Sequence, residues 1–413
     1  MTFPALTPRV QKLYVDLKRF VDEECIPAEP EYEKQISDID NGLQHSFSTK
    51  SPRWSRVPPT IETLKLKAQK LQLWNLFLPK TYGESPGLTN YEYGVLCEVI
   101  GRSALAPEAT NTSAPDTGNM EVLAKYGTAK QKDVWLKPLM NGEIRSAFCM
   151  TEPQVASSDA TNIETRFKRD GEFVVVNGRK WWISGAGDPR CRVYLVMGLS
   201  VESEDVAKHQ RQSVLIVPAD TPGISVKRPM HVFGYDDAPH GHMEIVFDNV
   251  RVPVENFVLG EGRGFEIIQG RLGPGRIHHC MRAIGMAERA LDLHILRLTD
   301  TSRKTFGKIL ARHGSAASQI VKSRLDIQQA RLLVLHAAHQ IDLVGPKQAK
   351  LDIAIAKIVV PNIVCGVIDR AIQAYGAAGV SQDLPLARMY AFMRTLRIAD
   401  GKKKMYLVLL NHC

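Results

Sequence analysis

The spacing of hydrophobic residues changes twice along this chain. In the first part, apolar residues recur every three or four positions, the period of an amphipathic helix, starting with Val10, Leu13, Leu17, Phe20 and Val21. The same period predicts further helices over residues 61–73, 91–100, 120–126 and 131–140. Residues 26–58 carry many prolines and charges and are expected to form a loop or irregular segment.

From residue 146 the hydrophobic period becomes two, which is typical of strands. Because both central residues of a type I′ turn need positive φ, Asn177-Gly178 predicts a tight hairpin between the first two strands. No helix alternates with the strands, and no Gly-x-Gly-x-x-Gly follows one, so a Rossmann domain is disfavoured. We expect a small antiparallel barrel or sandwich, with strands at residues 173–176, 181–184, 193–197, 214–217, 224–226 and 243–247.

The helical period returns after residue 260 and persists to the end of the chain. Long apolar faces over residues 277–295, 320–344 and 349–375 indicate a bundle of the four-helix type. A chain of 413 residues exceeds the size at which one core normally stops growing. We therefore predict a multi-domain protein with a helical domain at 1–145, a β-domain at 146–258 and a helical bundle at 259–413.

Residues 148–184 contain the most suggestive chemistry. Thr151, Ser157 and Ser158 place hydroxyl groups around Pro153, and Trp182 lies close to Ser184. Hydroxyls, backbone amides and an indole suit a flat, polar, aromatic ligand such as a flavin. An ordinary hairpin with surface serines and a core tryptophan is the alternative, and these residues alone leave both interpretations open.

Five stretches in order resemble segments of the acyl-CoA dehydrogenase superfamily, over residues 60–401. The closest likeness is to the branch of family members 10 and 11, because of Ser157-Ser158-Asp159 and residues 114–120. This resemblance implies a helical N-domain, a middle β-domain and a C-terminal four-helix bundle whose end departs from the family. The five stretches cover residues 148–159, 180–184, 247–253, 303–308 and 373–376.

The resemblance also implies bound FAD. Thr151, Trp182 and Ser184 would hold the flavin ring, with contributions from Phe148, Met150, Ser157, Ser158 and Ile183. In relatives, the residues matching Arg303, Phe306 and Gln373 reach the FAD of a neighbouring subunit. Gly376, also expected at the cofactor, begins the family's usual glycine pair, whose second position is Ala377 here. A guanidinium suits the paired phosphates of that cofactor. A homodimer or homotetramer with a shared cofactor site is therefore expected, whereas a basic surface cluster is the alternative for Arg303.

Asp400 matches the family's catalytic base, because it follows Arg397-Ile398-Ala399 and precedes Gly401. It would remove the α-proton of an acyl-CoA thioester while the β-hydrogen leaves as hydride to the flavin, giving a trans-2-enoyl-CoA. Arg276 and Ser158 are candidates for substrate contact. After Gly401 the chain departs from the family, with Lys402-Lys403-Lys404 in place of the usual continuation.

Composition and net charge further limit the ligands and cellular compartments to be expected for this protein. The net charge is +9, but the basic residues are dispersed along the chain, which suits anionic coenzyme A and argues against nucleic acid. Seven scattered cysteines without a Cys-x-x-Cys pair indicate a reducing, intracellular compartment and no metal site. Neither a membrane span nor a secretory signal is expected. Cytoplasm, mitochondrion and peroxisome stay unresolved.

Two other functions remain open. A nitroalkane oxidase-like flavoprotein shares the implied fold and also uses an aspartate as its base. The second alternative is a non-catalytic flavin-binding paralogue, as in the adaptive-response branch of the superfamily. For the dehydrogenase, the electron acceptor would be an electron-transferring flavoprotein or oxygen. The pathway would be catabolism of fatty, branched or hydroxylated acyl groups.

Overall fold

The computed structural model describes residues 3–38, 48–49, 51–203 and 205–399. The chain forms two compact units, each built from separate stretches of sequence. Unit 1 comprises Met1–Pro27, Leu88–Pro107 and Gly273–Cys413, and unit 2 comprises Ala28–Gly87 and Glu108–Leu272. The predicted order of helical, β and helical parts is confirmed, while the boundaries at 145 and 258 stay a prediction.

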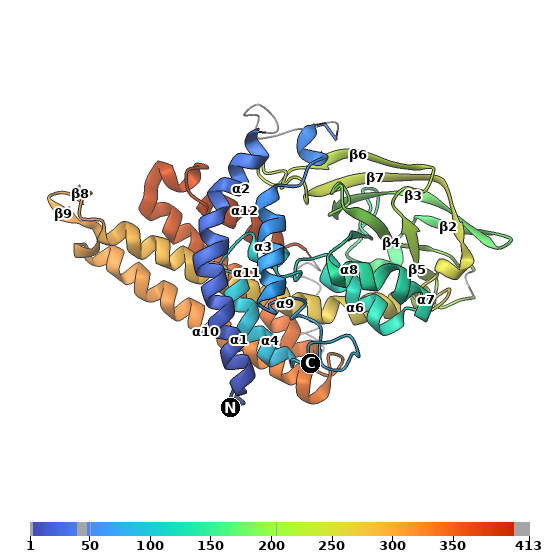
Figure 1. The fold of residues 1–413 in the computed structure, drawn as a ribbon, viewed down its shortest axis with the longest axis horizontal. Coiled ribbons are helices and arrows are strands. Elements are labelled where there is room, and N and C mark those ends of the chain that lie inside the picture. The colour runs from blue at the N-terminus through green and yellow to red at the C-terminus, as the bar shows by residue number, and fades with distance from the viewer. Residues whose placement is uncertain (1–2, 39–47, 50, 204, 400–413) are drawn as a thin grey trace. The chain divides into compact units, whose positions relative to one another are not determined.

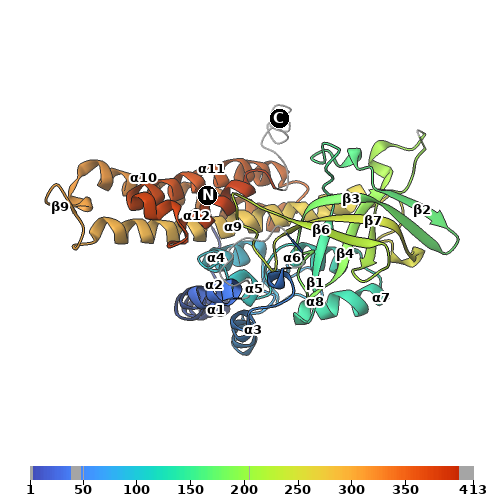
Figure 2. The ribbon, with the colours of Figure 1, turned by 90° about the horizontal axis from the view of Figure 1, so that it is seen from above.

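Unit 1 is helical, and its helices pack through apolar faces with helical spacing. In α10, Ile327, Ala330, Val334 and Ala337 are buried at intervals of three and four residues. Helix α10 packs against α11 and α4, and α11 packs against α12 (Figures 1 and 2). The helices are α1 (Pro8–Phe20), α4 (Asn90–Ile100), the part of α9 (Gly264–Thr299) beyond Leu272, α10 (Gly314–Val344), α11 (Lys350–Tyr375) and α12 (Leu386–Leu396).

The region of α11 and the turn after it, Lys350–Val380, is long and apolar enough to cross a membrane by length and composition. This conflicts with the expectation that no such segment exists. Its most apolar window is 56% buried inside the protein, as in the core helix of a globular bundle. We therefore interpret α11 as a core helix of unit 1.

Unit 2 combines short helices with one seven-stranded sheet, in the order β1-β4-β2-β3-β7-β6 with β5 paired to β4. The sheet is not purely antiparallel as expected, because β1 and β2 both pair in parallel with β4. Its strands are β1 (Arg145–Cys149), β2 (Arg166–Asp170), β3 (Phe173–Ser184), β4 (Cys191–Leu199), β5 (Gln212–Pro218), β6 (Ile224–Met230) and β7 (His242–Pro253). The helices include α2 (Ile26–Asp38), α3 (Pro59–Lys70), α5 (Ala106–Ala109), α6 (Asp116–Tyr126), α7 (Ala129–Gln131) and α8 (Lys137–Asn141).

The predicted loop at 26–58 is wrong in its first part, because Ile26–Asp38 is helical with Pro30 inside the helix. A π-helical turn, Val21–Cys25, precedes this helix. Such turns accommodate a locally disturbed hydrogen-bond ladder. Proline content therefore suggested a break where the chain forms an irregular helix.

The predicted hairpin at Asn177-Gly178 is also wrong, since β3 runs unbroken from Phe173 to Ser184. Its register against β7 shifts between Val176 and Gly178, where Asn177 lies opposite both Asp248 and Asn249, so the dipeptide lies opposite a β-bulge in β7. Glycine is needed there for space: a Cβ on Gly178 would lie 2.3 Å from Thr165 Oγ1. The actual turn lies earlier, between β2 and β3, where Gly171 has φ of +59°.

Candidate functional site

The two segments predicted to hold a flavin lie side by side in unit 2. The backbone N–H of Trp181 in β3 donates to the carbonyl of Thr151, just after β1, at 3.0 Å. Ser157 closes the loop after β1, because its Oγ accepts the Glu152 N–H at 2.8 Å. Ser158 is exposed, and Phe148, Met150 and Thr151 are partly buried. The loop after β1 and the second half of β3 are therefore neighbours.

A buried ion pair fastens these segments together. Lys180 Nζ, which is fully buried, lies 2.8 Å from Glu152 Oε1 and also donates to the carbonyls of Met150 and Met197 at 3.0 and 2.7 Å. Glu152 accepts further bonds from the N–H and hydroxyl of Thr165, at 2.9 and 2.6 Å. Burial alone would raise the pKa of the Glu152 carboxyl, but Lys180 and these donors hold it below its usual value.

Neither member of the pair was singled out from the sequence. A signal was present for Lys180, because alternation in β3 places it on the same face as the buried Val174 and Val176. A charged residue at an inward-facing strand position needs a partner. Nothing in the local pattern could have identified Glu152 as that partner.

Trp182 lies in a bulge of β3, where Trp181 and Trp182 together lie opposite Glu244 of β7. Its φ is +56°, a left-handed conformation that bulky residues rarely adopt, and the register shifts between Lys180 and Ile183. The side chain of Trp182 is 38% exposed, whereas that of Ile183 is buried in the core of the sheet. Ile183 can therefore offer only its backbone to a ligand, while Trp182 offers its ring.

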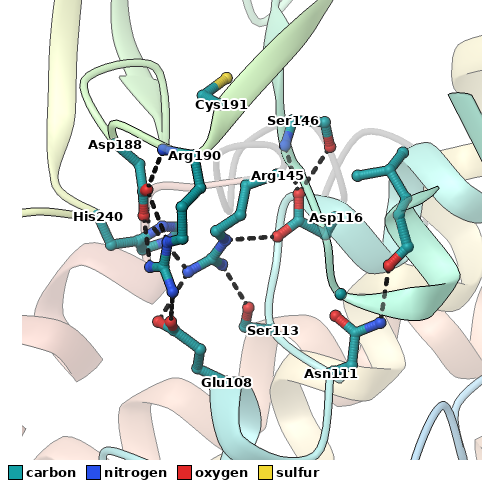
Figure 3. A network of polar contacts seen from close by, with 12 residues as sticks. Glu108, Asn111, Ser113, Asp116, Arg145, Ser146, Asp188, Arg190, Cys191 and His240 are labelled. Carbon is teal, nitrogen blue, oxygen red and sulfur yellow. Dashed lines mark hydrogen bonds and ion pairs between the residues drawn. The ribbon is translucent and has the colours of Figure 1, made fainter. Parts of the chain in front are cut away.

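A network of hydrogen bonds and ion pairs also holds β1 to the start of α6 (Figure 3). Asp116, at the start of α6, accepts bonds from the N–H and hydroxyl of Ser146, both at 2.7 Å, and pairs with Arg145 Nε at 2.9 Å. Arg145 also pairs with Glu108 at 2.7 Å. Burial opposes ionisation of Glu108, but Arg145 and Arg190 hold the pKa of its carboxyl well below its usual value. Residues 114–120, quoted above for their family likeness, thus anchor α6 to the strand that carries Phe148.

Unit 2 also contains a pocket of about 460 Å³ beside the Ser157 loop. Its charged lining consists of two basic residues, Lys208 and Arg211, and one acidic residue, Glu164, and its neutral polar lining is Thr161, Asn162 and Gln212. Its apolar lining includes Val155 and Leu199. Basic and apolar groups in one pocket suit a phosphorylated ligand with an apolar portion.

The remaining predicted site residues belong to unit 1. Arg303 and Phe306 lie at a small hairpin of β8 (Lys304–Thr305) and β9 (Lys308–Ile309). Phe306 is 95% exposed with φ of +51°, and Gly307 follows with +78°, the conformations of a two-residue hairpin turn. The Arg303 side chain is exposed and lies 3.4 Å from Asp300.

Gln373 is exposed at the end of α11, and Gly376 follows with φ of +64°. The end of α9 packs against this point, because Arg297 Nε donates to the Ala374 carbonyl at 3.1 Å. Arg276 is partly buried on α9. Asp400 lies outside the described residues, so its placement stays a prediction.

The described residues contain six cysteines, all buried and none in a disulfide. Burial raises the pKa of the Cys149 thiol, next to Met150, to about 12, which makes it unreactive at neutral pH. Over the same residues, no group of three or more His, Cys, Asp or Glu side chains is placed to hold a metal ion.

Comparison with family models matches three successive parts of the chain. The N-terminal, middle and C-terminal domains of acyl-CoA dehydrogenase match residues 7–143, 147–250 and 262–410. The three parts define a flavoprotein oxidoreductase class with a β-domain between helical ones. The chain belongs to the acyl-CoA dehydrogenase family.

Individual relatives agree with this assignment. The chain is 53% identical over 407 residues to acyl-CoA dehydrogenase family member 10 of Mus musculus, covering 97% of this chain and 36% of that protein. It is 55% identical over 352 residues to the probable acyl-CoA dehydrogenase FadE2 of Mycobacterium tuberculosis, covering 85% and 84%. The chain thus spans about a third of the mouse protein, and 49% of a probable acyl-CoA dehydrogenase, IBR3, of Arabidopsis thaliana.

Solved structures share the fold over nearly the whole chain. A putative acyl-CoA dehydrogenase from Mycobacterium abscessus superposes with a TM-score of 0.92 at 45% identity, covering 99% of this chain and 98% of that one. Butyryl-CoA dehydrogenase from Megasphaera elsdenii superposes with a TM-score of 0.81 at 26% identity, covering 100% and 99%.

Proposed function

We propose that this chain is an FAD-dependent dehydrogenase that converts an acyl-CoA thioester to the trans-2-enoyl-CoA. The observation that carries the proposal is that the Lys180–Glu152 pair and the Trp181–Thr151 hydrogen bond join the segment of Thr151 to that of Trp182 and Ser184. Family membership and the structural similarity to the butyryl-CoA dehydrogenase from Megasphaera elsdenii support it.

The residues of this surface fit FAD. The hydroxyls of Thr151 and Ser184 and the backbone amides at Phe148, Met150 and Ile183 supply donors for the polar edge of the ring. Trp182, held outward by its bulge, supplies an aromatic face. Ser157 shapes the loop, and Ser158 is exposed beside it. When bound, FAD supplies the acceptor for the substrate's β-hydrogen.

Coenzyme A would bind in the pocket of unit 2, where Lys208 and Arg211 offer positive charge. Arg276 and Ser158 would contact the substrate. Asp400 would remove the α-proton, a step that needs the thioester carbonyl polarised by hydrogen bonds and the base shielded from water. An electron-transferring flavoprotein or oxygen would reoxidise the enzyme.

We further propose a homodimer or homotetramer in which Arg303, Phe306, Gln373 and Gly376 reach the cofactor of a neighbouring subunit. The near-complete exposure of Phe306, in a turn that fixes its backbone, is consistent with a partner-facing role. An apolar stripe on α10 offers a surface for such a partner, since Val321, Leu325, Leu332 and Leu343 recur on one face and are 47–63% exposed. The acyl groups concerned would be fatty, branched or hydroxylated, in an intracellular reducing compartment.

The purified protein tests the cofactor part of this proposal. Acid precipitation should release FAD into the supernatant, because no covalent attachment is expected. A protein that is colourless and cannot be reconstituted with FAD would overturn the proposal.

Asp400→Asn tests the proposed base. The variant keeps the size and hydrogen bonding of the side chain but cannot accept a proton. FAD should still bind, and acyl-CoA should still perturb its spectrum, while flavin reduction should slow by ~10²–10⁴ in stopped-flow measurements. Reduction at the parent rate would remove Asp400 from the mechanism.

A further inference from the structure

The hydroxyl of Ser184 is held by a histidine that neither the motif nor the proposed function includes. Ser184 and His242 are cross-strand partners in β3 and β7, and Ser184 Oγ lies 2.9 Å from His242 Nδ1. Side chains of directly opposite residues lie on the same face of a sheet. The neighbouring pair, Ile183 and Met243, is buried in the core, so Ser184 and His242 face the other side.

His242 also contacts the aromatic member of the proposed flavin surface. Its ring lies 5.8 Å from the ring of Trp182 in an edge-on arrangement. Trp182 has its left-handed backbone in the bulge that lies just before the Ser184–His242 pair in the register of β3 against β7. His242 therefore touches two of the three side chains proposed to hold the flavin.

The protonation of His242 limits what it can do. Burial lowers the pKa of the imidazole, although the charge of Asp237 works in the opposite direction. A neutral imidazole has one N–H and one acceptor nitrogen, so Nδ1 can either donate to Ser184 Oγ or accept its proton. In the first arrangement the Ser184 O–H is free to point toward a ligand; in the second it is turned away.

We propose that His242 is a positioning residue: Nδ1–H donates to Ser184 Oγ and thereby directs the Ser184 hydroxyl proton to the flavin ring. This inference rests on the proposed function, because it requires FAD on the surface formed by Thr151, Trp182 and Ser184. In oxidised flavin, N5 of the isoalloxazine ring can accept a hydrogen bond. In reduced flavin, N5 carries a hydrogen of its own. A donor fixed toward it favours the oxidised form, so His242 lowers the reduction potential.

The test measures the flavin midpoint potential of the FAD-loaded enzyme rather than its turnover. His242→Phe removes the nitrogen, whereas His242→Asn can keep a donor near the position of Nδ1. His242→Phe should shift the oxidised-to-reduced ratio threefold to tenfold toward the reduced form, as expected for one hydrogen bond, or about 15–30 mV upward for a two-electron couple. His242→Asn should recover most of this shift.

A double-mutant cycle separates an effect through Ser184 from a general loss of packing. Ser184→Ala should raise the potential by a similar amount, and adding His242→Phe to it should cause no further shift. An equal shift from His242→Phe in both backgrounds, or none in the parent, would overturn this inference while leaving the proposed function intact. A parent protein that binds no FAD would overturn both.

Discussion

At the scale of single residues, the Lys180–Glu152 pair is the contact on which the candidate site most depends. Both side chains are fully buried, and their hydrogen-bonding groups are matched by each other, by nearby backbone and, for Glu152, by the Thr165 hydroxyl. Such a pair is weak evidence for stability in itself, but removing one partner leaves an uncompensated buried charge. The pair therefore makes the geometry of the two flavin segments sensitive to a single substitution.

Lys180→Met should lower the free energy of unfolding by about 3–5 kcal/mol and should also reduce FAD retention. Lys168→Met is the matched control, because Lys168 is exposed on the adjacent strand β2. That variant should change stability by no more than about 0.5 kcal/mol. Denaturant unfolding measures both, and equal effects of the two substitutions would contradict the role given to Lys180.

Glu121 should make the free energy of unfolding depend on pH. It is buried on α6 with Tyr82 Oη 3.4 Å from its carboxylate, and burial raises the pKa of the carboxyl from 4.5 to about 7, against the charges of Lys125 and Arg271. Between these pH values the folded protein holds a proton that the unfolded chain has lost. Stability therefore falls as pH rises from about 4.5 to 7, by up to about 3 kcal/mol.

Glu121→Gln cannot ionise, so its unfolding free energy should lack this fall. Urea unfolding at pH 5 and pH 8 measures the difference. The exposed Glu172→Gln is the control and should follow the parent protein at both pH values. A Glu121→Gln variant with the parent's pH dependence would show that another group causes it.

At the scale of elements, periodicity predicted most helices and strands, but local dipeptides misled where tertiary contacts decide. Asn177-Gly178 has the composition of a tight turn, yet Gly178 is required because Thr165 approaches it. Thr165 cannot move away, since its hydroxyl donates to Glu152 at 2.6 Å. This contact joins residues distant in sequence, so no local pattern could have predicted it.

Gly178→Ala should destabilise the protein by about 1–3 kcal/mol, because the added methyl overlaps Thr165 Oγ1. Gly83→Ala is the control: nothing lies within 4 Å of a Cβ at that position, so its effect should be small. Thermal unfolding compares the two. A Gly178→Ala protein as stable as the control would show that Thr165 has room to shift.

The residues of the candidate site also differ in whether a local sequence motif or a contact across strands identifies them. Thr151, Trp182 and Ser184 are predicted site residues because two short sequence motifs carry them, and the structure places these two motifs next to each other. Lys180 and Glu152 were missed, and so was His242, because their roles come from packing across strands. The bulge at Trp182 likewise appears only in the register of β3 against β7.

At the scale of the whole molecule, the open question is whether the cofactor is shared between subunits. Arg303→Ala should remove about 1.5–3 kcal/mol of charge-assisted hydrogen bonding to the FAD phosphates. FAD retention should then weaken roughly tenfold to a hundredfold. Equilibrium dialysis measures the affinity, and Arg312→Ala, in the short turn just after β9, serves as a control for lost positive charge.

Light scattering of the parent protein completes that test. A dimer or tetramer with FAD bound is expected. A monomer that retains FAD tightly would contradict a shared site, whatever the effect of Arg303→Ala.

The most direct test of the proposed dehydrogenation is anaerobic titration of the FAD-loaded protein with acyl-CoA thioesters of different length and branching. Nitroalkanes are titrated in parallel. The absorbance of oxidised flavin should bleach with at least one acyl-CoA and with no nitroalkane, and a trans-2-enoyl-CoA should form in equal amount. Bleaching by a nitroalkane alone would indicate the oxidase. Bound FAD that no thioester reduces would contradict the proposed dehydrogenation.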